Sequence, residues 1–191
     1  MTLLIAGLLL FLSVHSTAII APGWRTAQVA RRGEAAWKGL YALLSIAGFV
    51  LLVYGYGAAR QSPVVLYTPP TFTRHLALLL MLPVFPLLLA AYLPGRIKTA
   101  AKHPMLLAVK LWALAHLLAN GNLHDVVLFG TFLAWAVADR ISIKRRTAAR
   151  AVPAASLRPM NDAIALAGGL AVYAIFVLWA HLKLIGVSPL G

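Results

Sequence analysis

Two histidines inside long apolar stretches are the residues of this chain best suited to chemistry. His15 lies in the first such stretch and His116 in the fourth, and an ionisable side chain within an apolar span marks a candidate functional site. Each histidine is about 12 residues, or roughly 18 Å of helix, from the start of its stretch. If the two helices start on opposite sides of a membrane core about 30 Å thick, both imidazoles lie near its middle. Since neutral imidazole ligates haem iron, we predict a haem b held between His15 and His116.

The residues around the second of these histidines support this hypothesis. Trp112, Ala113 and Asn120 share one side of the expected helix with His116. An alanine beside the histidine leaves room for a flat macrocycle, and the Trp112 indole is expected to pack on the edge of that macrocycle. We therefore predict that these three residues line the haem pocket.

Two cations are candidates for the haem propionates. Lys110 is expected either to extend toward the basic surface of the membrane or to pair with a propionate. Arg74 is the candidate for the same role on the opposite side. The alternative for each buried histidine is an interhelical hydrogen bond to a hydroxyl or a carbonyl group, with no cofactor.

The other four histidines are predicted nearer the membrane surfaces. His75, His124 and His181 fall toward the outer side, where they could form a metal site, with Asp125 as a further ligand. No local spacing such as H-x-x-x-H supports that site. His103 precedes a proline at the start of the fourth stretch, and His103 and His75 are the alternative metal ligands.

Composition restricts the class of protein. Of the 191 residues, 62% are hydrophobic and 11% are charged, which indicates a polytopic membrane protein rather than a soluble domain. There is no cysteine, so disulfides, thiolate ligands and cysteine nucleophiles are excluded. The formal charge of +13 sits in short segments between apolar stretches, which favours contact with the lipid bilayer over a nucleic-acid partner. The acids all lie at or beyond the ends of the apolar stretches, which excludes a carboxylate dyad deep in the membrane: Glu34, Asp125, Asp139 and Asp162.

We predict an all-α fold, a membrane helical bundle of about six transmembrane helices in one domain over residues 1–191. Pro83 and Pro86 predict a kink in the third helix. Small residues in the last helix predict its close packing, within one bundle or between two copies. They are Ala163, Ala167 and Ala171 at four-residue spacing, with Gly168 and Gly169 beside them. The six stretches lie near residues 2–21, 40–58, 76–94, 104–122, 124–139 and 162–184.

The distribution of lysine and arginine predicts the orientation in the membrane. The segments between the first and second, third and fourth, and fifth and sixth stretches carry 13 of the 17 basic residues. The positive-inside rule places these segments in the cytoplasm and both termini outside. The proline-containing segment between the second and third stretches is expected to lie extended across the outer mouth of the bundle.

Several segments along the chain carry a resemblance to a known family. They are FLSVHS (11–16), APGWR (21–25), GEAAWKGLY (33–41), YGYGAAR (54–60), RH (74–75), LPGRIKTAAKHPMLLAVKLWALAHLLANG (93–121) and LFGTFLAWAVADRISIKRR (128–146). Through them the sequence resembles the NnrU family of bacterial inner-membrane proteins, along nearly its whole length. That resemblance implies a link to nitrite and nitric-oxide metabolism in denitrifying bacteria.

The NnrU family is similar to the 15-cis-zeta-carotene isomerases, which are haem-b membrane enzymes. The resemblance implies that their histidine ligands correspond to His15 and His116. Their alternative cysteine ligand falls at Ala113, so this chain cannot exchange cysteine for histidine.

Three functions remain open from the sequence. The first is haem-dependent redox chemistry, or cis-trans isomerisation of a lipophilic small molecule, with a redox partner protein. The second is a haem-free accessory or assembly protein for nitrite or nitric-oxide reduction. The third is a methyltransferase-like enzyme, because KHP at 102–104 is similar to the RHP element of isoprenylcysteine and phospholipid methyltransferases. Those enzymes need a later glutamate, and no glutamate follows Glu34 here.

Overall fold

The computed structural model of the chain describes residues 1–147 and 158–191. Within these ranges it contains helices and no strand, which confirms the all-α prediction. The helices are α1 (Thr2–Ile20), α2 (Pro22–Arg32), α3 (Glu34–Ala59), α4 (Thr71–Met81), α5 (Val84–Ala90), α6 (Arg96–Ala101), α7 (Pro104–Ala119), α8 (Leu123–Thr147), α9 (Pro159–Ile175), the π-helix η1 (Phe176–Ala180) and α10 (His181–Ile185).

Within the described ranges, five helical segments are long and apolar enough to cross a membrane. They correspond to five of the six predicted stretches. Two of the spans combine several helices: one consists of α4 and α5, and the other consists of α9, η1 and α10. The remaining stretch is α7, with 16 residues, or about 24 Å, which is shorter than a membrane core of about 30 Å. The structure thus confirms a polytopic helical bundle, with α7 as a shorter apolar helix packed against α4, α5 and α8. The spans are Thr2–Ile20, Glu34–Ala59, Thr71–Ala90, Leu123–Arg145 and Pro159–Ile185.

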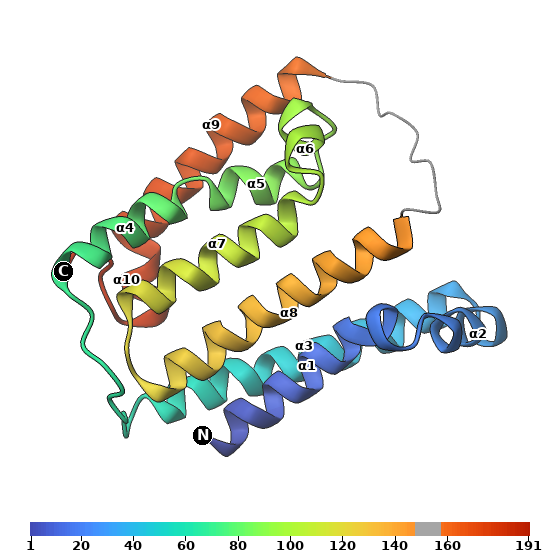
Figure 1. Cartoon of the computed structure of the whole chain (residues 1–191), viewed down its shortest axis with the longest axis horizontal. Coiled ribbons are helices and arrows are strands. Elements are labelled where there is room, and N and C mark those ends of the chain that lie inside the picture. The colour runs from blue at the N-terminus through green and yellow to red at the C-terminus, as the bar shows by residue number, and fades with distance from the viewer. Residues whose placement is uncertain (148–157) are drawn as a thin grey trace.

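Figure 1 places both termini at the same end of the bundle, on the left, which we call the terminal end. The segment between α3 and α4 lies at the same end. The helix ends that lead into the three basic segments lie at the opposite end, on the right, which we call the basic end. This arrangement agrees with the orientation predicted from lysine and arginine, in which the termini share the outer side.

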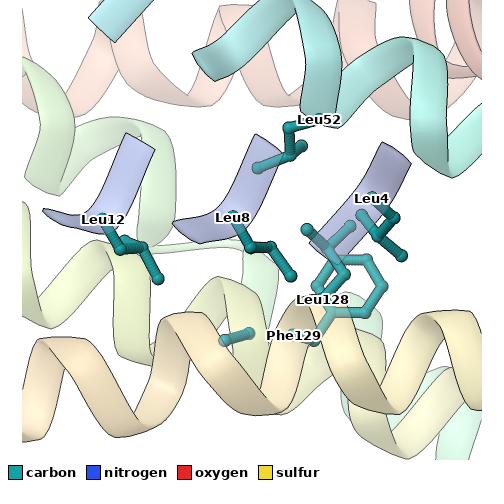
Figure 2. Packing of buried hydrophobic residues seen from close by; sticks show 7 residues of the cluster. Leu4, Leu8, Leu12, Leu52, Leu128 and Phe129 are labelled. Carbon is teal, nitrogen blue, oxygen red and sulfur yellow. The ribbon is translucent and has the colours of Figure 1, made fainter. Parts of the chain in front are cut away.

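The first and third helices pack with their backbones almost in contact. A Cβ atom added to Gly7 would collide with the backbone of Leu52, and one added to Gly55 would collide with the backbone of Leu4. Glycine is therefore required at these positions, and it lets the two helices approach closely. Figure 2 shows the apolar cluster on which this pair rests, formed by Leu4, Leu8, Leu12, Leu52, Leu128 and Phe129.

The predicted kink in the third stretch is a break between α4 and α5 at Pro83. Beyond the break, α5 packs against α9, where a Cβ on Gly169 would collide with the backbone of Pro86. Of the small residues predicted to allow close packing, Gly169 therefore makes the contact, whereas Ala163, Ala167 and Ala171 are exposed. The buried row is formed by Ala165 and Gly169, because the close contact uses the adjacent face of the helix.

The segment between α3 and α4 is extended, as expected, and the structure shows in addition that it pairs with the turn between α7 and α8. Val65 and Asn122 form an isolated antiparallel bridge, and the Leu66 N–H donates to the Gly121 carbonyl at 2.9 Å. A Cβ on Gly121 would collide with the carbonyl oxygen of Tyr67. This pairing covers the terminal end of α7 and α8.

Candidate functional site

His116 is held in a fixed orientation near the terminal end of α7. Its Nδ1 lies 2.8 Å from the carbonyl oxygen of Trp112. Because a carbonyl oxygen can only accept, Nδ1 carries the proton, and the neutral ring keeps a lone pair on Nε2. Phe129 of α8 stacks on the ring, with the centroids 4.4 Å apart. His116 thus has the tautomer and the fixed plane of a metal-ligating histidine.

His181 of α10 lies beside His116. Their ring centroids are 6.5 Å apart and their planes differ by 24°. The Nδ1 of His181 is 2.6 Å from the carbonyl oxygen of Val187, so its Nε2 also keeps a lone pair. His181 directly follows the π-helix η1, and π-helical turns are frequent at functional sites. The structure therefore brings together His116, which we predicted as a haem ligand, and His181, which we predicted at an outer metal site.

The spacing of this histidine pair is compatible with ligation of one iron. Two imidazoles on opposite sides of an ion, each with a bond of about 2.0–2.1 Å, have centroids roughly 6 Å apart. Among the residues that the structure describes, no group of three or more His, Asp or Glu side chains is placed to hold a metal ion.

His15 has the same local geometry in different surroundings. Its Nδ1 lies 2.7 Å from the carbonyl oxygen of Phe11, so the Nε2 lone pair is again available. The Phe11 ring stacks on the imidazole at 4.1 Å, and the rings of Tyr41 and Trp135 lie at 5.2 Å and 6.1 Å. His15 is therefore enclosed on several sides by aromatic rings, toward the basic end of α1.

His15 and His116 lie at different levels of the bundle. His116 stacks on Phe129, and His15 contacts Trp135. These two residues of α8 are six positions apart, or about 9 Å along the helix. Phe132 lies between them and contacts the ring of Phe11 at 5.8 Å. In the described part of the chain, no direct ring contact joins the two histidines, so the predicted pairing on one iron requires these rings to move.

The three predicted pocket residues surround His116 in different ways. The Trp112 ring centroid lies 5.4 Å from that of His116 and 5.0 Å from that of Phe129. Ala113 is fully buried within the apolar cluster of Figure 2. The Asn120 amide Nδ2 donates to the carbonyl oxygen of His116 at 2.9 Å, which satisfies a carbonyl at the end of α7. Trp112 thus contacts the His116 ring, whereas Ala113 packs in the core and Asn120 closes the helix.

The two predicted propionate partners lie on opposite sides of His116. Arg74, at the start of α4, is beside Gly191 at the terminal end. A second arginine at that end, Arg60, donates from Nη1 to the carbonyl oxygen of Ile185 at 2.7 Å. Lys110 is half-buried on α7, six positions nearer the basic end than His116. Both arginines therefore lie near the segment that follows His181.

The alternative metal ligands His75 and His103 lie at opposite ends of the bundle. His75 is exposed on α4 at the terminal end, and His103 is the N-cap of α7 at the basic end. Burial, together with the positive charge of Arg140, lowers the pKa of His103 below its usual range. The fold does not bring these two histidines to a common site.

A buried polar cluster at the start of α8 was not predicted. Asp125 is 2% exposed, and its Oδ1 accepts a hydrogen bond of 2.6 Å from the Tyr56 hydroxyl. Its Oδ2 accepts from the Asn122 side chain at 3.0 Å, in the manner of an acid that closes a helix N-terminus. His124 is also buried, with Nε2 3.5 Å from Asp125 Oδ1. His124 is thus committed to this cluster, and the three-histidine outer metal site is not formed among the described residues.

A comparison with protein families assigns the chain to one of them. The family model described as NnrU protein matches residues 3–189. The chain belongs to the NnrU family. Neither the curated proteins nor the solved structures that were searched contain a match. Because the family match extends over nearly the whole chain, the histidine pair and the buried polar cluster both lie within the NnrU region.

In this NnrU protein, the rings of His116 and His181 are oriented in the same way. Each ring has its Nδ1 proton bound by a backbone carbonyl oxygen. The pairing of His116 with His181 depends on the π-helix before His181, and apolar periodicity gives no signal for such a turn. The only sequence sign of His181 as a site residue is an imidazole near the end of a membrane helix.

Proposed function

We propose that this NnrU protein binds one haem b near the terminal end of the bundle. His116 is the first axial ligand, and His181 is the second in this arrangement. The observation that carries the proposal is the pair of nearly parallel rings 6.5 Å apart. Haem would supply reversible one-electron redox chemistry at this site.

The chain's own residues support the site in three ways. The carbonyl oxygens of Trp112 and Val187 hold the Nδ1 protons, which directs both Nε2 lone pairs away from the backbone. Phe129 stacks on His116 and restricts the plane of its ring. Arg74 supplies positive charge at the same end of the bundle, where a propionate would require it.

The cellular role that accompanies this proposal is redox chemistry in the bacterial inner membrane, linked to nitrogen-oxide metabolism. Isomerisation of a lipophilic substrate is the corresponding enzymatic role, because a polyene would reach a membrane site from the lipid. The site offers two histidines and no cysteine, so a change of axial ligand would have to exchange one histidine for another group.

The test is the absorption spectrum of the full-length protein, purified in detergent from haem-sufficient cells and then reduced with dithionite. We expect a low-spin, two-histidine spectrum. His116→Ala should lower the bound haem by about tenfold or more, and His181→Ala should convert the spectrum to high spin. His75→Ala is the matched control, since His75 is an exposed histidine at the same end of the bundle.

Two outcomes would change the proposal in different ways. Loss of the low-spin spectrum in His15→Ala, with no change in His181→Ala, would restore the pairing of His15 with His116. A colourless protein, even after haem is added, would refute haem binding and favour a haem-free accessory role.

A further inference from the structure

A second site lies at the basic end, away from the histidine pair. There a cavity of about 590 Å³ opens between the end of α1, the short helix α2 and the start of α3. This volume is within the range of small-molecule sites, roughly 300–1,000 Å³. Its principal lining residues are His15, Arg25, Val29, Trp37, Lys38 and Tyr41.

The lining has an excess of positive charge at its rim. Arg25 and Lys38 are the cations, and Glu34 is the one acid among the lining residues. Glu34 pairs with Lys38, whose Nζ lies 2.7 Å from its carboxylate, and it also lies in the field of Arg25. Two cations against one acid leave an excess of one positive charge among these lining residues, which attracts an anion.

The inner wall of the cavity is aromatic and has one further polar atom. Trp37 is 7% exposed and is packed edge-on by Trp24 of α2 at 5.6 Å. The ring of Tyr41 lies 5.2 Å from that of His15. Since the Nδ1 of His15 is bound by its own helix, the imidazole can present only Nε2 to the cavity.

The position of the cavity identifies the class of anion. His15 is five positions before the end of α1, or about 7 Å from that helix end at the helical rise. The helix α2 lies outside the spanning segments and has no buried residue. It carries Arg25, Arg31 and Arg32, and such basic interfacial helices attract anionic lipid. The phosphates of phospholipids lie at this depth.

We propose that the cavity binds the phosphate-bearing headgroup of an anionic phospholipid, with Arg25 as its principal cation. The glycerol and the start of the acyl chains rest against Trp37 and Val29. This site lies outside the proposed haem site, because it uses neither His116 nor His181. It assigns His15 to the wall of a lipid site.

The experiment measures lipid that stays bound to the full-length protein. Native mass spectrometry of protein released from phosphatidylglycerol nanodiscs would compare wild type with Arg25→Gln and Arg31→Gln. Arg25 lines the cavity, whereas Arg31 is on the same helix but does not line it, so both variants lose one charge. Each variant loses the general attraction of one surface charge for anionic lipid, and only Arg25→Gln also loses a cation of the cavity. We therefore expect Arg25→Gln to retain about fivefold less phosphatidylglycerol than Arg31→Gln, a difference of about 1 kcal/mol.

Equal loss in both variants would overturn the proposal, because it would indicate attraction to surface charge alone. A second arm adds soluble glycerol 3-phosphate and measures thermal stability. Stabilisation that depends on Arg25, together with equal lipid retention in wild type and Arg25→Gln, would assign the cavity to a soluble phosphate ester and reject the lipid. The haem spectrum is recorded on the same samples, and it should not change in Arg25→Gln, so failure of either proposal is seen separately.

Discussion

The hydroxyl of Tyr56 on α3 donates a hydrogen bond of 2.6 Å to the carboxylate of Asp125 on α8. The carboxylate is 2% exposed, and the two residues are 69 positions apart in the sequence. The bond links the closely packed α1–α3 pair to the helix that carries Phe129, which stacks on His116. It therefore stabilises the position of the helix that supplies Phe129 to the proposed haem site.

Removal of this hydroxyl is expected to destabilise the fold. Tyr56→Phe leaves one oxygen of a buried carboxylate with a missing partner, and we expect a loss of about 1.5–3 kcal/mol of unfolding free energy. The measurement is denaturant unfolding in detergent, followed by far-ultraviolet circular dichroism. Tyr54→Phe is the matched control, because Tyr54 is on the same helix and 69% exposed. Equal stability of the two variants would show that the Tyr56–Asp125 bond contributes nothing.

Two glycines on α3 should respond oppositely to the same substitution. A Cβ on Gly55 would collide with the Leu4 backbone, whereas one on Gly57 would have no heavy atom within 4 Å. We expect Gly55→Ala to lose about 1–3 kcal/mol by overpacking and Gly57→Ala to be neutral or stabilising by up to about 1 kcal/mol. The same unfolding assay checks both. Similar losses in the two variants would contradict the close packing of α1 and α3.

Asp162, in the first turn of α9, caps the N-terminus of α6. Asp162 Oδ2 accepts from the Arg96 backbone N–H at 2.9 Å, and its Oδ1 accepts from that of Ile97 at 3.0 Å. We expect Asp162→Ala to lower stability by about 0.5–2 kcal/mol, because the N–H groups at the start of α6 lose their acceptor. Asp162→Asn retains one acceptor oxygen and should recover part of the loss. No difference between alanine and asparagine would argue that the hydrogen bonds are not the cause.

Much of the fold could be predicted from local patterns, because membrane helices are defined by apolar length and by the placement of basic residues. The break between α4 and α5 could also be predicted locally, because it follows from Pro83. The candidate site was harder to predict, because it depends on contacts between segments that are distant in the sequence. The apolar pattern places Asp125 at a helix end, and it does not show that the extended segment around Val65, paired with Asn122, covers that end of α8. His181 was assigned to the surface, since the π-helix before it leaves no trace in the apolar pattern.

His103, at the N-terminus of α7, leads us to predict that the stability of the fold depends on pH. The pKa of His103 is lowered by burial and then by the charge of Arg140, with Lys102 and Lys110 acting in the same direction. An unfolded chain therefore binds more protons than the folded one below about pH 6.5, and stability decreases as the pH falls through that value. We expect the melting temperature in detergent to rise between pH 5.5 and 7.5, and His103→Gln to reduce that slope. His75→Gln, at the exposed opposite end, should retain the wild-type slope. A slope unchanged in His103→Gln would show that another group controls the pH dependence.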